Sequence, residues 1–199
     1  APLYVAGNKF NFYSPITDLE DRILYQQKNT HFPVSFERMP ATKRFFQIGI
    51  DEYSYINDVK IYTKLMPHPG NAYGIRIEDG DSIFVYTSDC EFTINEIEDI
   101  HNYEQFFADA DLLLFDSQYT FQESVIEKIS WGHSSSSIAI DIASKFNVKK
   151  LILFHHEPNY DDEKLSGLLA NAKTYTSVNK KVSDDLTIDM AEEGKVYEF

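Results

Sequence analysis

The sequence predicts a layered α/β fold, and three observations support this prediction. Apolar and polar residues alternate in a β-like manner from Val59 to Phe92. After Phe92 the pattern changes to helical stretches separated by short apolar strands. One of these strands, Leu151-Ile152-Leu153-Phe154, is continuously apolar, as expected of a strand that is covered on both faces. Strands first, followed by alternating strands and helices, indicate a sheet that packs against helices.

The first fifty residues predict short strands around one helix. Lys9 to Tyr13 is apolar at alternate positions and predicts a strand, which Ser14-Pro15 ends. Asp18 is suited to cap a helix that runs through Leu24 to Gln27. Between residues 32 and 49 two prolines break the chain, so we expect short extended pieces joined by turns.

The region from Val59 to Phe92 predicts an antiparallel meander, because turn residues at Pro69-Gly70-Asn71 and at Glu78 to Asp81 mark the ends of successive strands. The last predicted helix begins with Asp161 and Asp162, whose charge suits the positive end of a helix dipole. From residue 101 on, the predicted elements are a helix at 101–110, a strand at 112–115, a helix that begins near 121, a helix at 136–146, a strand at 151–154 and a helix at 161–173.

Length, composition and charge limit the classes of protein. The chain has 199 residues, of which 43% are hydrophobic and 15% aromatic, so we expect one domain over residues 1–199 with one sizeable core. Cys90 is the only cysteine, and no run is long and apolar enough to span a bilayer or to act as a signal peptide, which favours the cytoplasm. The formal net charge of −14 repels polyanions and argues against nonspecific nucleic-acid binding.

Four side chains suited to metal or acid–base chemistry lie where apolar strands end. They are His68, Asp89, His133 and His155. Because ligands bind at the open ends of strands in layered α/β folds, we expect these side chains to converge. Imidazole and carboxylate groups are ligands of zinc and manganese.

Each of these residues taken alone also has a structural interpretation. His68 stands between two prolines and suits a turn, Asp89 suits the acceptor of turn hydrogen bonds, and His155 suits a hydrogen-bonded core histidine. Their spacings contain no local metal-binding motif, so the residues by themselves leave both interpretations open.

Longer segments around these residues form a recognisable series along the chain. They are HPGNAYGIRIE (68–78), FVYTSDCEF (84–92), ADLLLFDSQYT (110–120), WGHSSSSIAIDIA (131–143) and LILFHHEPNYDDEKL (151–165). In this order and approximate spacing they resemble the metallo-β-lactamase superfamily. More narrowly, they resemble its phosphodiesterase-like branch, which includes tRNA 3′-processing nucleases and phosphoribosyl cyclic phosphodiesterases. The resemblance implies the C-terminal portion of an αββα sandwich without its N-terminal strands. It also implies a metal-dependent hydrolase acting on a small phosphodiester or ester.

The resemblance further implies a centre of two divalent ions, zinc or manganese. His68 would ligate the first ion, His155 the second, and Asp89 would bridge both. His133 would face the substrate phosphate and protonate the leaving oxygen, for which the near-neutral pKa of imidazole is suitable. Ser134 would contact substrate and help to position His133.

Three further residues have less definite roles. Asp116 follows a predicted buried strand and either orients a ligand imidazole from behind or caps the next helix. His156 is interpreted as a structural neighbour of the metal ligand His155, with an exchange of the two roles left open. Trp131 is interpreted as packing at the core or rim, rather than as a base-stacking platform.

The HxHxDH cluster of the superfamily does not occur in these 199 residues. In relatives it precedes a segment that resembles Ala1 to Pro15. Without it each ion would keep two protein ligands, whereas zinc sites usually have three or four. We therefore expect weak or no metal binding by this chain alone, and a fragment that is inactive by itself.

Two further expectations follow from the missing cluster. The alternative function is a non-catalytic nucleotide-binding or regulatory module that has lost the metals. The missing N-terminal strands would also leave an exposed sheet edge, which favours a homodimer.

Overall fold

The chain forms two sheets, which lie in two separate units, Ala1–Ile50 and Asp51–Phe199. The computed structural model describes residues 2–98, 100–183 and 185–199. The expectation of a single domain over residues 1–199 stays a prediction. Within the described ranges, none of the helices combines the length and the apolar character needed to cross a bilayer.

The first unit contains a two-stranded parallel sheet. β1 (Lys9–Ser14) pairs along its length with β2 (Thr42–Gln47), and α1 (Leu19–Gln26) lies between them in sequence. The ring of Phe12 on β1 stacks on Phe45 of β2 with centroids 5.0 Å apart. The predicted strand at 9–13 and the helix through Leu24 are confirmed. The Asp18 side chain, however, makes no capping hydrogen bond and instead accepts from Arg22 at 2.8 Å. In the stretch with two prolines, β2 is accompanied by a single 3₁₀ turn, η2 (Phe36–Arg38).

The second unit is built on one seven-stranded sheet in the order β3-β4-β5-β6-β7-β8-β9. The strands from β3 to β6 are antiparallel, and β6, β7, β8 and β9 are parallel to one another. The bounds of the seven strands are β3 (Tyr53–Ile56), β4 (Val59–Met66), β5 (Ala72–Asp79), β6 (Ser82–Thr87), β7 (Leu112–Asp116), β8 (Lys150–Phe154) and β9 (Thr187–Met190). The predicted meander and the two predicted apolar strands are confirmed, whereas β3 and β9 were not predicted.

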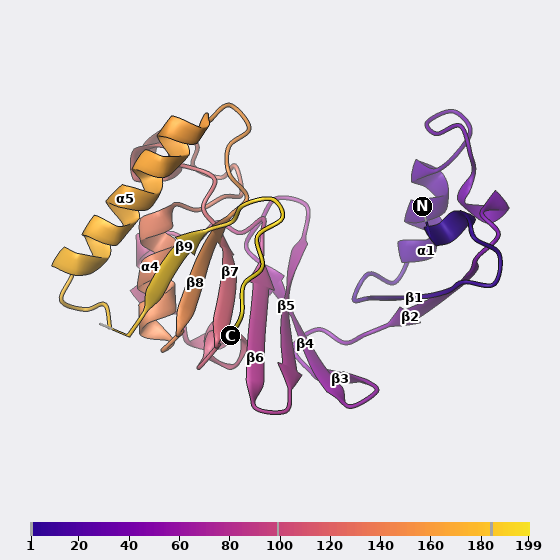
Figure 1. Ribbon diagram of the computed structural model, residues 1–199, viewed down its shortest axis with the longest axis horizontal. Helices are drawn as coiled ribbons and strands as arrows, with labels where there is room; N and C mark the ends of the chain where they lie inside the picture. The colour runs from indigo at the N-terminus through magenta and orange to yellow at the C-terminus, as the bar shows by residue number, and fades with distance from the viewer. Residues whose placement is uncertain (1, 99, 184) are drawn as a thin grey trace. The chain divides into compact units, whose positions relative to one another are not determined.

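Helices pack against this sheet. Figure 1 shows α4 and α5 on the same side of β7, β8 and β9. Asp161 caps α5, because its carboxylate accepts a hydrogen bond of 2.8 Å from the backbone N–H of Lys164. The helical elements of the second unit are α2 (Ile94–Glu98), η3 (His101–Tyr103), α3 (Glu104–Phe107), η4 (Glu123–Glu127), α4 (Ser136–Lys145) and α5 (Asp162–Val178).

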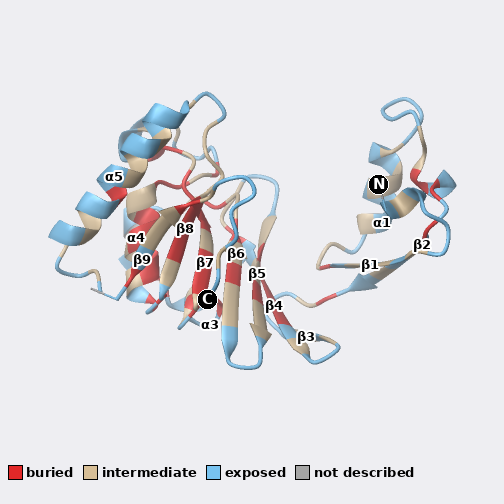
Figure 2. Cartoon of the chain, viewed as in Figure 1, coloured by how far each residue is buried: buried red, intermediate tan, exposed pale blue. Residues whose placement is uncertain are grey.

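The main core lies between the sheet and the helices. Leu113 of β7 and Leu151 of β8 are completely buried and belong to the same apolar cluster as Ile138 and Ile142 of α4. In Figure 2 the buried class covers much of β7 and β8 and the inner side of α4. Each such side chain stabilises the fold by about 1.5–3 kcal/mol relative to leaving it exposed. A sheet packed against helices confirms the predicted α/β class.

Candidate metal centre

The strand order brings four separate chain segments to one edge of the seven-stranded sheet. This edge is the one formed by the carboxyl ends of the parallel strands, and it is called the sheet edge below. β6, β7 and β8 are parallel, with Thr87 beside Phe115 and Asp116 beside Phe154. Two antiparallel pairings relate β4 to β6, so β4 runs in the same direction. The turns that follow β4, β6, β7 and β8 therefore all leave the sheet at the same edge.

Asp89 lies between two histidines at this edge. Its Oδ1 atom is 3.7 Å from Nε2 of His68 and 3.9 Å from Nε2 of His155. These separations are too long for hydrogen bonds. They suit donor atoms that share an ion, because zinc binds imidazole nitrogen and carboxylate oxygen at about 2.0–2.2 Å. The pair of His68 and Asp89, and the pair of Asp89 and His155, are therefore each spaced as donors to a divalent ion.

The backbone at two of these residues is unusual. Asp89 has φ 51° and His155 has φ 60°, which are left-handed values that are uncommon for residues other than glycine. Such conformations cost about 1–3 kcal/mol each and are concentrated at functional sites. Both residues lie just after a strand, Asp89 after β6 and His155 after β8.

Asp116 holds His133 in a fixed orientation. The Nδ1 atom of His133 donates to Oδ2 of Asp116 at 2.7 Å, and the buried carboxylate also accepts from the backbone N–H groups of Cys90 at 3.2 Å and Gln118 at 3.1 Å. Burial alone would raise the pKa of Asp116, but the hydrogen bond from His133 and the nearby imidazole of His155, at 3.6 Å, outweigh it and the pKa is lowered. Asp116 is therefore ionised at neutral pH, and Nε2 of His133 is the ring nitrogen left free.

The four predicted residues form one cluster. The ring centroids of His133 and His68 are 5.4 Å apart, and those of His133 and His155 are 4.8 Å apart. The Asp116 carboxylate lies 3.6 Å from Nδ1 of His155 and raises the pKa of that histidine. Two groups of potential ligands overlap here, His68 with Asp89 and His133, and Asp116 with His133 and His155, each with donor atoms within 4.8 Å of one another.

Ser134 and His156 lie beside the cluster. The hydroxyl of Ser134 donates to the carbonyl of Cys90 at 2.7 Å and accepts from the backbone N–H of Phe92 at 3.1 Å. These bonds tie the His133 loop to the Asp89 loop, and a contact of Ser134 with substrate stays a prediction. Burial lowers the pKa of His156, and its Nε2 atom is buried without a hydrogen-bond partner. A neutral imidazole with a free nitrogen keeps both roles of His156 open.

Sequence reasoning missed one residue of this region, Glu91. Its two carboxylate oxygens accept hydrogen bonds of 2.7 Å each from the backbone N–H groups of Ser130 and Gly132. A glutamate two positions after Asp89 carries no local signal for such contacts, because its partners are 39 and 41 residues away in sequence.

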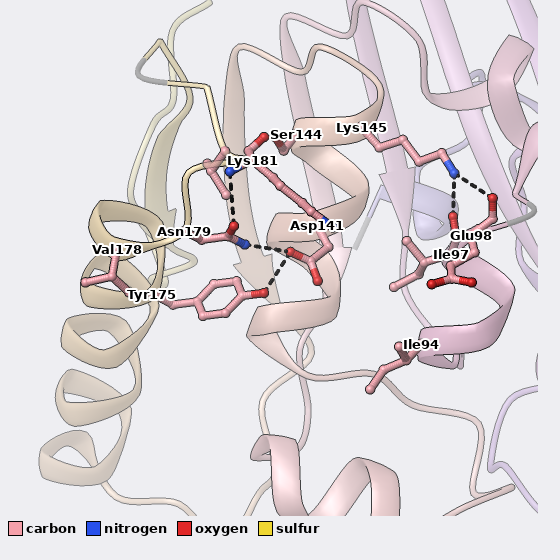
Figure 3. Close-up of a pocket in the computed structure, with 11 residues that line it drawn as sticks. Ile94, Ile97, Glu98, Asp141, Ser144, Lys145, Tyr175, Val178, Asn179 and Lys181 are labelled. Carbon is pink, nitrogen blue, oxygen red and sulfur yellow. Dashed lines mark hydrogen bonds between the residues drawn. The ribbon is translucent and has the colours of Figure 1, made fainter.

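A cavity of about 730 Å³ lies elsewhere, among α2, α4, α5 and the segment after α5 (Figure 3). Within it, the Tyr175 hydroxyl donates to Oδ1 of Asp141 at 2.9 Å, and the Lys145 ammonium donates to the carbonyl oxygens of Ile97 and Glu98. Histidine does not occur among the described residues that line this cavity. The groups suited to metal chemistry thus gather at the sheet edge.

The chain is similar to known proteins in both sequence and fold. The profile of the beta-lactamase superfamily domain matches residues 8–156. The chain is 39% identical over 92 residues to Ribonuclease Z of Sulfurisphaera tokodaii, a match that covers 45% of the chain and 25% of that protein. It is 29% identical over 164 residues to Ribonuclease Z of Picrophilus torridus, covering 76% of the chain and 49% of that protein. The chain therefore spans between a quarter and a half of the length of these relatives.

Several solved structures have the same fold as this chain. The metallo-β-lactamase-fold protein YhfI from Bacillus subtilis has a TM-score of 0.66 at 21% identity, covering 95% of this chain and 65% of that one. The short form of human tRNase Z has a TM-score of 0.59 at 15% identity, covering 77% of this chain and 62% of that one. At these identities the likeness establishes the fold, and it confirms the architecture that the sequence motifs implied.

Proposed function

Because the chain belongs to the metallo-β-lactamase superfamily, we propose that it supplies one part of a two-metal centre that hydrolyses phosphodiesters. The convergence of His68, Asp89, His133 and His155 at one sheet edge carries the proposal. Two of its relatives are named Ribonuclease Z, and ribonucleases cleave phosphodiester bonds. The net charge of −14 favours a small phosphodiester over a long polyanion as the substrate.

In this proposal His68 holds one divalent ion, His155 the other, and Asp89 both, with zinc or manganese as the metal. When bound, such a pair supplies Lewis acidity toward the phosphoryl oxygens and lowers the pKa of water. Each position receives two protein donors from these three residues, whereas zinc sites usually have three or four. We therefore expect the chain alone to bind zinc weakly and to need further ligands for turnover.

His133 is proposed to give a proton from Nε2 to the leaving oxygen. Its Nδ1–H is fixed by Asp116 at 2.7 Å, which sets the direction of Nε2. General acid catalysis of this kind contributes about 10²–10⁴-fold in rate. Asp116 acts through His133 and is a positioning residue.

Metal binding is tested by calorimetric titration of the chain with zinc. We expect His68→Ala to weaken binding by about tenfold, since one of few donors is lost. His101→Ala is the matched control, because His101 is exposed and lies on η3, outside the cluster. Equal zinc affinity of the two variants would contradict the assignment of His68.

Turnover is tested on a polypeptide extended upstream to include an HxHxDH segment. Loaded with zinc or manganese, it is expected to hydrolyse bis-p-nitrophenyl phosphate, and His133→Ala is expected to lower kcat by about 10²–10⁴-fold. Asp116→Asn should lower kcat with little change in KM, because substrate does not contact Asp116. A metal-loaded protein inactive on all phosphodiesters and esters would rule out the proposed function.

A further inference from the structure

The segment between β7 and α4 is unusually apolar on its surface. Four large side chains on it are exposed, with exposed fractions of 48% for Phe121, 68% for Ile126, 55% for Ile129 and 61% for Trp131. Trp131 is therefore not a core residue, and of the two predicted positions the rim remains. Exposed clusters of large apolar residues mark binding surfaces more often than single exposed residues do.

Contacts connect the Trp131 indole to the candidate metal centre. The Lys128 ammonium lies 5.9 Å from the ring centroid of Trp131 and 4.0 Å from that of Tyr119. The Tyr119 ring in turn lies edge-on to His133, with centroids 5.7 Å apart. Lys128 is held between the carboxylates of Glu123 and Glu157, at 3.7 Å and 3.6 Å. Trp131 thus lies at the rim of the centre, beside a fixed positive charge.

Glu91 fixes the conformation of the turn that carries Trp131. Its two oxygens accept from the N–H groups on either side of Trp131, at Ser130 and Gly132, with distances of 2.7 Å. Both flanking residues have left-handed backbones, φ 66° at Ser130 and φ 96° at Gly132. The backbone N–H of Glu91 also donates to the carbonyl of Pro67 at 2.7 Å, next to His68. A surface held in this way loses little freedom when it binds a ligand.

The turn is also in close contact with His68. A Cβ atom added at Gly132 would lie 2.3 Å from Cδ2 of the His68 ring. The backbone before His133 therefore covers the side of this candidate ligand, and Glu91 ties the loops of His68, Asp89 and His133 to one another.

We propose that Trp131, positioned by Glu91, is a stacking surface for a planar aromatic group of the substrate, and that this group is a nucleobase. The inference rests on the proposed function, which places a phosphodiester at His133. An indole face binds any base, because every base has a π face, and stacking needs no positive field. This suits a chain whose net charge is −14, in which the charge of Lys128 is already paired with Glu123 and Glu157.

The chain as it stands permits a direct test, because Trp131 is its only tryptophan and all tryptophan emission comes from it. Titration with adenosine 5′-monophosphate is expected to quench this emission saturably, whereas ribose 5-phosphate, which has no base, is not. Metal and turnover are not needed for this readout. Absence of saturable quenching, or equal quenching by both compounds, would overturn the inference.

Calorimetry of variants separates stacking from general binding. Trp131→Leu is expected to weaken adenosine 5′-monophosphate binding at least fivefold, and the side chain is exposed, so the variant should fold. Phe121→Leu, an exposed aromatic on the same segment, is the matched control and should bind like the parent chain. If Trp131→Leu and Phe121→Leu bind adenosine 5′-monophosphate with equal affinity, the proposal is contradicted.

The role of Glu91 is tested by Glu91→Gln, in which the amide nitrogen cannot accept from a backbone N–H. We expect several-fold weaker quenching by the nucleotide at an almost unchanged melting temperature, whereas Glu104→Gln on α3 should leave both unchanged. Emission that shifts with protein concentration but not with nucleotide would instead identify this face as a contact between copies of the chain, and would overturn the inference. If the extended enzyme is active and Trp131→Leu leaves its kcat/KM for nucleoside phosphodiesters intact, the inference fails and the proposed function stands.

Discussion

Asp116 shows how one buried residue can organise a site. Its carboxylate receives an imidazole N–H from His133 and backbone N–H groups from Cys90 and Gln118. A buried carboxylate with this many donors is stable as an anion. The same hydrogen bonds fix the loops after β6 and β7 and before α4 relative to one another. The sequence left two roles open for Asp116, and the geometry favours orientation of an imidazole.

Gly132 is a second residue whose identity is set by its surroundings. It has φ 96°, and an added Cβ would lie 2.3 Å from the His68 ring. Gly132→Ala is therefore expected to lose about 1–2 kcal/mol from the left-handed backbone and about 1–3 kcal/mol more from crowding. Urea unfolding measures the sum. Gly194→Ala is the matched control, because Gly194 has φ 78° and no atom within 4 Å of its added Cβ. If the two variants lose equal stability, crowding at His68 is refuted.

Among the elements, α4 connects two parts of the second unit. It begins at Ser136, just after the His133 loop, and its later turns carry Asp141, which faces the cavity of Figure 3. Burial raises the pKa of Asp141, and the hydrogen bond from Tyr175 and the charge of Lys181 only partly oppose this rise. Ionisation of Asp141 is thus less favourable in the folded chain than in the unfolded chain.

The raised pKa of Asp141 makes the stability of the chain depend on pH. Because the pKa is raised on folding, the contribution of Asp141 to stability is complete below its unfolded pKa of about 3.9 and is lost as the pH rises through the higher folded value. Asp141→Asn keeps an oxygen that accepts from Tyr175 but does not ionise. We expect its melting temperature, relative to the parent chain, to be higher at pH 7 than at pH 4. Asp81→Asn, an exposed acid in the turn between β5 and β6, controls for the loss of one negative charge. A difference that is the same at both pH values would contradict this account.

The sequence predicted those strands whose burial is visible in a local run of residues, and it missed β3 and β9. β7 and β8 are apolar runs whose burial can be inferred from local sequence alone. β9 has four residues, Thr187–Met190, and it exists because it pairs in parallel with β8, from Lys150 beside Thr187 onward. Pairing between such distant segments is not visible in a local pattern. β3 pairs instead with its neighbour β4 across the two-residue turn Asn57-Asp58, which the predicted meander, starting at Val59, left out.

In the molecule as a whole, the strand pattern predicts one part of the site, whereas the other part depends on how the loops fold. Side chains at the ends of parallel strands must reach one edge, so the meeting of Asp89, Asp116 and His155 could be predicted from the strand pattern. The role of Glu91 could not, because its partners, Ser130 and Gly132, lie on a turn whose path depends on the folded loops. The exposure of Trp131 depends on the same turn.

The second unit contains a complete core of its own. The buried apolar cluster between the sheet and helices runs in sequence from Tyr62 to Met190, so every member lies within Asp51–Phe199. The histidine cluster lies in the same range. A chain of about 150 residues buries about 68–70% of its unfolded surface, which is enough for independent folding. We therefore predict that residues 51–199 fold cooperatively when produced alone.

Near-ultraviolet circular dichroism and urea unfolding measure this outcome. The expected result is a single cooperative transition, and Leu113→Ala, which removes a completely buried side chain of β7, should lower the free energy of unfolding by about 2–5 kcal/mol. Leu65→Ala on β4, whose side chain is exposed, is the matched control and should have a much smaller effect. If residues 51–199 retain helical signal but show no near-ultraviolet signal and bind a hydrophobic dye, the unit lacks fixed packing by itself. Its core would then depend on residues outside this range.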